Sequence, residues 1–284
     1  YMLTPAGTDS PWADTPGTKQ STAYMACRRS YHVFMTDGAW NSQSKTDDRV
    51  ALGDSKDRTL PDGTVYKANA TQSRIYKDNY GDANDDNAST FSDFAFNSWA
   101  TDLQGGMDNS VKPPPNQVGA EKFKTPTCNA ANNCDETQAY WNPKNDPATW
   151  QHMNTYTIGF GLGAVNWSNE SDTPVNWDNN NKSRDNYGGD FADVVQGAKK
   201  WPDVKTDDGG TPEIRTIELW HGALNGRGKY YPAKTADDLT QAFAAIMDTI
   251  NDDTSKPLVS IAASSSTLQT GLNAFIAGYD ATNW

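Results

Sequence analysis

The stretch Ser30-Tyr-His-Val-Phe-Met-Thr-Asp-Gly-Ala-Trp-Asn41 decides the fold of this chain. Its apolar run, Tyr31 to Met35, is long enough for a buried β-strand. The polar turn Thr36-Asp37-Gly38 ends that strand, because glycine can take the positive φ of a sharp turn. In open α/β sheets, ligands bind beyond the carboxyl ends of the strands, where carboxylate and hydroxyl oxygens suit a hard divalent cation. Asp37 is therefore a candidate metal ligand, or else a cap of the next helix.

Charge and hydropathy argue against two classes of protein. The 284 residues carry a formal net charge of -12, whereas nucleic-acid binding needs clustered Lys and Arg, so we expect no nucleic-acid partner. No apolar run approaches about 20 residues, the length that spans a bilayer, so we expect no transmembrane segment. The chain begins at Tyr1 without a charged and apolar leader, which we interpret as a mature or trimmed chain.

The three cysteines are Cys27, Cys128 and Cys134. Cys128 and Cys134 share one polar loop, and we predict a disulfide between them, which indicates an oxidising compartment. A metal pair is the alternative, although CxxC spacing and neighbouring histidines are lacking. Cys27 is either a buried thiol or the partner of a cysteine outside this chain.

Helical and strand-like segments alternate along the chain, which predicts a doubly wound α/β sheet. Capping-box patterns at Thr90 and Thr235 begin two amphipathic helices. The second of them buries an apolar face of Leu239, Phe243, Ile246, Met247 and Ile250. The remaining predicted elements are a buried strand over 155–161, a short helix entered at Asp146-Pro147, helices over 190–201 and 217–224, and a strand over 229–231. Polar insertions are expected near 41–88, 105–150 and 163–189, and residues 255–284 are expected to form a connector.

The loop before Thr90 has the oxygen spacing of a calcium-binding loop. Asp82, Asn84, Asp86 and Asp93 stand at positions that supply ligands in EF-hand loops. The pattern departs from an EF-hand at its sixth position, where Asn87 replaces glycine, and at its twelfth, where Asp93 replaces glutamate. An acidic loop that places negative charge at a helix N-terminus explains the same residues.

Several linked stretches resemble PilY-type proteins, which assemble type IV pilus fibres and act as tip-associated adhesins. The stretches are Cys27 to Gly38, Trp99 to Leu103, Trp141 to Met153, Thr155 to Gly161, Leu219 to Gly228 and Phe275 to Trp284. The strand ending in Thr-Asp-Gly, followed by a helix and Tyr-Thr-Ile-Gly-Phe-Gly, is similar to the second half of a von Willebrand factor A domain. The resemblance covers nearly the whole chain.

The resemblance implies a von Willebrand factor A-like (Rossmann-like) domain over residues 1–254, lacking its first strand, and a connector toward a propeller-like carboxy-terminal domain. It also implies a metal-ion-dependent adhesion site for Mg²⁺ or Ca²⁺, in which Asp37 is the third element. The first element, Asp-x-Ser-x-Ser, does not occur in these residues, so Asp37 holds its position without the partners that the site needs.

By this resemblance we expect a non-enzymatic module of a type IV pilus-associated protein, supporting pilus biogenesis, surface attachment and twitching motility. The implied partners are minor pilins and host or abiotic surface ligands, at the pilus tip or outer surface of a Gram-negative bacterium. No catalytic motif is present, consistent with a protein that is not an enzyme. The alternative is a secreted carbohydrate-binding protein that uses the loop tryptophans Trp141, Trp150, Trp167 and Trp177.

Overall fold

The computed structural model has a parallel three-stranded sheet at its centre. It describes residues 2–4, 10–16, 24–37, 45–46, 53–78, 88–114, 139–160, 186–187, 191, 194–195, 197–202, 212–254, 262–263 and 274–275. The sheet has the order β1 (Ser30–Thr36), β6 (Met153–Phe160), β7 (Arg227–Ala233), and the opening stretch of the sequence forms β1 as predicted. In the register, Ser30 lies beside Met153 and Thr36 beside Gly159.

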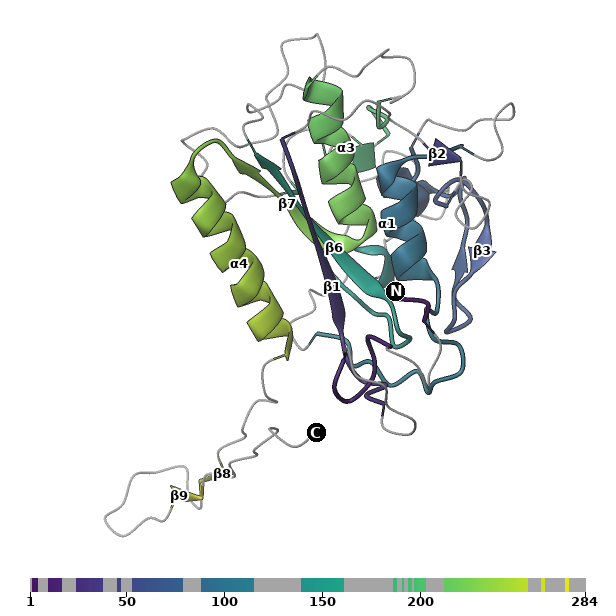
Figure 1. The fold of residues 1–284 in the computed structure, drawn as a ribbon. Helices are drawn as coiled ribbons and strands as arrows, with labels where there is room; N and C mark the ends of the chain where they lie inside the picture. Colours follow the sequence, from purple (N-terminus) through teal and green to yellow (C-terminus); the bar gives the residue numbers. More distant parts are fainter. Residues whose placement is uncertain are drawn as a thin grey trace.

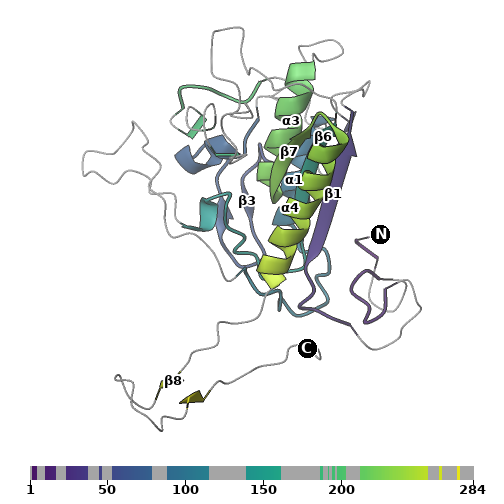
Figure 2. The same ribbon diagram turned by 90° about the vertical axis from the view of Figure 1, so that its left-hand side faces the viewer.

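Helices cover both faces of the sheet. Helices α1 (Phe91–Ala100) and α3 (Pro212–Asn225) pack together on one face, and α4 (Ala236–Thr254) lies on the other (Figures 1 and 2). Parallel strands covered on both sides are apolar or internally hydrogen-bonded along their length. Strand β6 shows this: Tyr156 and Ile158 pack under α4, while Thr157 faces α3 and donates from Oγ1 to the Leu219 carbonyl at 2.8 Å. The predicted alternation of strands and helices is confirmed as a mixed α/β fold.

Shorter elements form three antiparallel pairs and two 3₁₀ turns. The pairs are β2 (Lys45–Thr46) with β5 (Ala88–Ser89), β3 (Arg58–Thr59) with β4 (Val65–Tyr66), and β8 (Ala262–Ala263) with β9 (Ala274–Phe275); the turns are η1 (Thr71–Ile75) and η2 (Ala139–Trp141). Residues 53–78 were expected to be part of a polar insertion. Instead their apolar side chains join the main core beside α1 and α3: Leu60, Tyr66, Ala68, Ile75 and Tyr76.

Two sequence predictions need correction. Asp146-Pro147 does not begin a helix: residues 146–149 are not helical, and the Asp146 carboxylate contacts Trp99 and His152 in addition to the Ala148 amide. On α4, Phe243 and Met247 are exposed, at 39% and 54% of their surface, instead of facing the core. The sheet covers only a narrow stripe of α4, and Leu239, Ala242, Ile246 and Ile250 fill it.

The start of β7 requires glycine on both sides of Arg227. A Cβ on Gly226 would lie 2.5 Å from the Thr155 Cβ, and one on Gly228 would lie 2.1 Å from the Thr155 carbonyl oxygen. Both distances are closer than real carbon contacts, so only glycine lets β7 approach β6 here. Arg227 itself has a positive φ of 60°, which is uncommon for a residue with a side chain.

Both predicted capping boxes form. Thr90 accepts from the Asp93 amide at 3.2 Å, and its own amide donates to Asp93 Oδ2 at 3.0 Å. Thr235 and Asp238 make the same exchange at 3.1 and 3.0 Å. The two boxes differ in burial: Thr90 is fully buried and also donates to Asp78 at 2.9 Å, whereas Thr235 is exposed.

This difference predicts unequal costs for the same substitution. Thr235→Ala removes an exposed cap and should lower the free energy of unfolding by about 1 kcal/mol. Thr90→Ala also removes the buried hydrogen bond that Thr90 donates to Asp78 and should cost roughly 2–3 kcal/mol. Urea unfolding of the two variants measures both values, and equal losses would contradict the buried role of Thr90.

Candidate functional site

The three parallel strands direct their carboxyl ends to one edge of the sheet, where sequence analysis places Asp37. Asp37 follows β1 directly and is exposed. At the same edge, the described residues beside it are Gly159 and Phe160 of β6 and Ala233 of β7. None of these carries a carboxylate, and within the described ranges no group of three or more acidic, histidine or cysteine side chains could hold a metal ion. The described residues at this edge therefore do not fit a Mg²⁺ site by themselves, and the metal site stays a prediction.

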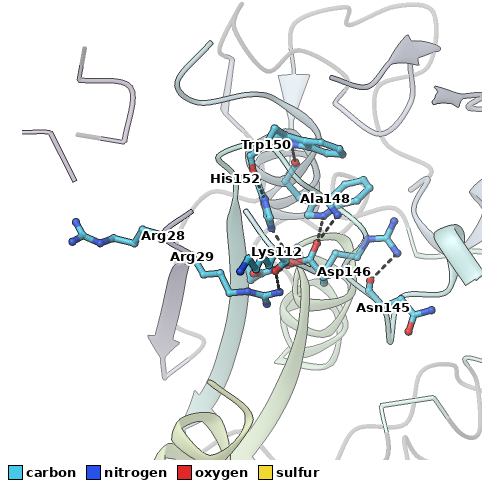
Figure 3. A network of polar contacts seen from close by, with 12 residues as sticks. Arg28, Arg29, Lys112, Asn145, Asp146, Ala148, Trp150 and His152 are labelled. Atoms are coloured by element: carbon cyan, nitrogen blue, oxygen red, sulfur yellow. Dashed lines mark hydrogen bonds and ion pairs between the residues drawn. The ribbon is translucent and has the colours of Figure 1, made fainter. Parts of the chain in front are cut away.

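The opposite edge carries a dense polar network, centred on Asp146 (Figure 3). Asp146 Oδ1 accepts from Trp99 Nε1 at 3.0 Å and from the Ala148 amide at 3.4 Å. Its Oδ2 lies 2.9 Å from His152 Nε2 and accepts from Asn154 Nδ2 at 3.1 Å. The other imidazole nitrogen of His152 lies 2.8 Å from the Trp150 carbonyl. A carbonyl oxygen can only accept, so Nδ1 of His152 carries a proton there.

Arginines extend this network to the starts of the neighbouring strands. Arg29, just before β1, donates to the Lys112 carbonyl (Figure 3) and adds its charge near Asp146. Arg227, the first residue of β7, donates to the Asn142 carbonyl at 3.0 Å. Its guanidinium lies 4.0 Å from the Trp99 ring centroid, a cation–π contact in a buried setting. The network thus joins the amino ends of all three strands.

Asp146 and His152 form a buried ion pair. Burial alone would raise the pKa of Asp146, but the charge and hydrogen bond of His152, with the hydrogen bond of Trp99, hold it well below its usual range. Burial alone would lower the pKa of His152, but Asp146 and the Trp150 carbonyl outweigh burial and raise it. A buried pair of this kind is costly to break, because removal of one partner leaves an uncompensated charge.

The pair predicts a defined pH dependence of stability. The His152 contribution is present below its unfolded pKa of about 6.5 and is lost as the pH rises through its raised folded pKa. The Asp146 contribution is present above its unfolded pKa of about 3.9 and is lost as the pH falls through its lowered folded pKa. His152→Gln should therefore cost about 3 kcal/mol near pH 5.5 and less above pH 8.

Urea unfolding at both pH values measures this difference. The control is Asp146→Asn/His152→Gln, which removes both charges and should show a flatter dependence on pH than either partner alone. An unchanged pH profile in His152→Gln would contradict the ion pair.

A second polar cluster surrounds the start of α1 and contains four buried carboxyl groups: Asp54, Asp78, Asp93 and Glu218. Asp93 Oδ1 accepts from the Asp54 amide at 3.0 Å, in addition to the capping box. Asp54 Oδ2 accepts from Asn225 Nδ2 at 2.9 Å, and Glu218 Oε1 accepts from the Ser92 amide at 2.7 Å. The cluster therefore fastens residues 53–78, α1 and α3 to one another.

Mutual proximity and burial favour protonated carboxyl groups in this cluster. Burial, followed by the charges of Asp93 and Asp78, raises the pKa of Asp54 well above its usual value. Burial, with a smaller contribution from Asp93 and against the hydrogen bonds of Ser92, raises the pKa of Glu218 to about 8. These shifts have the opposite consequence to that of Asp146: ionisation at alkaline pH weakens the cluster.

Glu218→Gln tests this consequence. A folded-state pKa above the unfolded value means that the contribution of Glu218 is present at acidic pH and lost as the pH rises through about 8. Glutamine keeps the acceptor oxygen for Ser92 but cannot ionise. The variant should unfold at a higher urea concentration than the unmodified chain near pH 9, and at a similar concentration near pH 5. Asp248→Asn, on the exposed side of α4, is the control; a lower stability of Glu218→Gln at about pH 9 would refute the assignment.

Of the four residues predicted to form a calcium-binding loop, the structure describes only Asp93. Asp82, Asn84 and Asp86 lie outside the described residues. Asp93 is buried, and both of its carboxyl oxygens accept backbone hydrogen bonds, so its described role is that of a helix cap. Calcium binding by this loop stays a prediction.

The predicted disulfide and the predicted sugar-binding tryptophans also include residues that the structure describes and residues that it does not. Cys27 is exposed and unpaired, and Cys128 and Cys134 lie outside the described residues, so their disulfide stays a prediction. Trp141 and Trp150 are buried, at 3% and 0% exposure, and belong to the core. They therefore provide no exposed surface for stacking a sugar, while Trp167 and Trp177 are not described.

Sequence reasoning missed the partnership of Asp146 with His152. Both residues lie in the stretch from Trp141 to Met153 that carries part of the resemblance. The available signal was a lone aspartate and a lone histidine shortly before a predicted strand, with Trp150 between them. The buried carboxyl cluster gave no comparable signal, because Asp54, Asp78 and Glu218 are far apart in the sequence.

Known proteins resemble this chain along most of its length. Type IV pilus biogenesis factor PilY1 of Pseudomonas aeruginosa, from strains PAO1 and PAK, is 36% identical over 250 residues, 88% of the chain. The PilY1 of strain UCBPP-PA14 is 33% identical over 251 residues, 87% of the chain. The chain carries a PilY-type segment. The match spans 18% of the length of each PilY1 protein.

The PilY-type resemblance inferred from the linked stretches is thus confirmed at the level of sequence. No protein-family model and no solved structure matches the chain. In the part of the chain that the structure describes, no helix is both long and apolar enough to cross a membrane.

Proposed function

We propose that this chain is a von Willebrand factor A-like module of a PilY-type protein and contributes to type IV pilus biogenesis through protein contacts. The observation that carries the proposal is the identity of 36% over 88% of the chain to a type IV pilus biogenesis factor. The proposed role is non-enzymatic, at the pilus tip or outer surface, with minor pilins and surface ligands as partners. Surface attachment and twitching motility would depend on these contacts.

The strand order supports the von Willebrand factor A-like part of the proposal. Strands β1, β6 and β7 follow one another in sequence and in space, with helices on both faces, as in one half of a doubly wound sheet. Among the described strands, β1 pairs only with β6, although its side chains from Tyr31 to Phe34 are partly buried. A further strand of a longer PilY-type protein would pair with this edge of β1, and it would bring the missing ligands toward Asp37.

The carbohydrate-binding alternative based on loop tryptophans is less favoured, because Trp141 and Trp150 serve the core. Protein contacts instead suit the carboxyl edge of the sheet. There, exposed Asp37 and the neighbouring Met35 and Phe160 offer mixed polar and apolar surface beyond a rigid scaffold.

A pull-down with the full-length PilY-type protein tests the assembly role. Gly228→Ala places a Cβ 2.1 Å from the Thr155 carbonyl and should separate β7 from β6, whereas Gly106→Ala meets no atom within 4 Å. After crosslinking, the unmodified protein and Gly106→Ala should recover minor pilins, and Gly228→Ala should recover about tenfold less. Limited proteolysis verifies that Gly228→Ala disrupts this segment. Equal recovery by a disrupted Gly228→Ala protein would assign the pilin contact to another part of the protein and refute the proposal.

A further inference from the structure

A basic pocket is lined by residues that belong to neither of the two sheet-edge sites described above. It has a volume of about 360 Å³ and is formed by residues 68–78 together with residues 197–200. Arg74, Lys77, Lys199 and Lys200 line it, and among the described lining residues Asp78 is acidic. The whole chain carries a net charge of -12, whereas four cationic side chains line this cavity. The local charge is therefore opposite in sign to that of the chain as a whole.

Buried contacts hold the two walls of the pocket together. Trp201 is 1% exposed, and its Nε1 donates to the Ile75 carbonyl at 2.9 Å. The Trp201 ring stacks on His221 at a centroid distance of 4.1 Å and an interplanar angle of 11°. His221 Nε2 in turn lies 2.7 Å from the Tyr76 carbonyl. The segment 197–200 is therefore anchored beside η1 by a core tryptophan, and the cationic side chains project from a fixed frame.

Arg74 is accommodated by a glycine in the opposite wall. Gly197 has a positive φ of 78°, and a Cβ at this position would lie 2.7 Å from Arg74 Nη1. The Arg74 guanidinium thus lies against the backbone of Gly197 and connects the two segments that form the pocket. On the other side, Lys77 Nζ donates to Asn69 Oδ1 at 2.9 Å, which places its ammonium group at the rim.

The lining defines the chemistry of a ligand. The cationic groups favour an anion, and a guanidinium with several ammonium groups recognises carboxylate or phosphate oxygens. Asp78, which is 2% exposed and accepts from Thr90 at 2.9 Å, favours a ligand that also carries hydrogen-bond donors. The described residues of the lining include no aromatic side chain, so they favour polar contacts over stacking on a ring. Its volume falls within the range of about 300–1,000 Å³ that small-molecule sites have in proteins.

We propose that this pocket binds a hydroxylated carboxylate, such as a sugar acid. The carboxylate would lie among Arg74, Lys77 and Lys200, and ligand hydroxyl groups would donate toward Asp78 and exchange hydrogen bonds with Asn69. A neutral sugar lacks the group that the cations attract, and inorganic phosphate lacks the several hydroxyl donors that suit Asp78. This inference rests on the pocket alone and does not depend on a role in pilus assembly.

Calorimetric titration with glucuronate, glucose and inorganic phosphate tests the proposal on the folded chain. Glucuronate should bind, glucose should not, and phosphate should bind more weakly than glucuronate. Lys77→Gln/Lys200→Gln should weaken glucuronate binding by about tenfold or more, and Lys56→Gln, an exposed lysine outside the pocket, by less than about twofold. The affinity should also fall as the salt concentration rises, because screening weakens the attraction between exposed charges.

Several outcomes would overturn the proposal. They are absence of glucuronate binding, glucose binding of equal strength, phosphate binding tighter than glucuronate binding, and equal effects of the double variant and Lys56→Gln. Thermal unfolding of each variant confirms that it is folded. If the double variant does not fold, the single variants Lys77→Gln and Lys200→Gln replace it, each with a several-fold loss of affinity expected.

Discussion

The buried contact between Asp146 and His152 is the constraint on which the sheet depends. Asp146 accepts four hydrogen-bonding contacts, from an indole, a backbone amide, an imidazole and a side-chain amide. Its partners come from α1, from the irregular segment before β6, and from β6 itself. A buried carboxylate is costly unless it is hydrogen-bonded and paired, and His152 provides the pairing charge.

This network leaves the two edges of the sheet with different tasks. At the amino edge, Arg29, His152 and Arg227 stand at the starts of β1, β6 and β7, and their polar groups are directed into the protein. Strand positions are thereby fixed where the chain enters the sheet. At the carboxyl edge, Asp37, Met35 and Phe160 are exposed. A scaffold that is rigid at one end can carry variable loops and contact residues at the other, as open α/β sheets commonly do.

Local patterns in the sequence predicted the elements whose structure is determined locally. The apolar run from Tyr31 to Met35 formed β1, and the capping boxes at Thr90 and Thr235 begin helices, because each of these signals acts within a few residues. The failures involve contacts between distant segments. Asp146-Pro147 has the pattern of a helix start, yet no helix forms there, and the Asp146 carboxylate binds Trp99 from a distant helix together with His152. Residues 53–78 lack periodicity, yet their aromatic side chains complete the core around Phe96 and Trp141.

The basic pocket could not be predicted from the sequence for the same physical reason, since more than 120 positions separate Lys77 from Lys199 along the chain. Only the burial of Trp201 against Ile75 and His221 brings the two pairs together. The pocket also touches the carboxyl cluster at α1 through Asp78, whose carboxyl group accepts from Thr90. The charge of Asp78 contributes to raising the pKa of its neighbour Asp54, so the pocket wall and the carboxyl cluster share this residue. Occupancy of the pocket and protonation of the cluster would therefore be thermodynamically linked, so that a ligand at the surface alters how firmly residues 53–78 are held to α1 and α3.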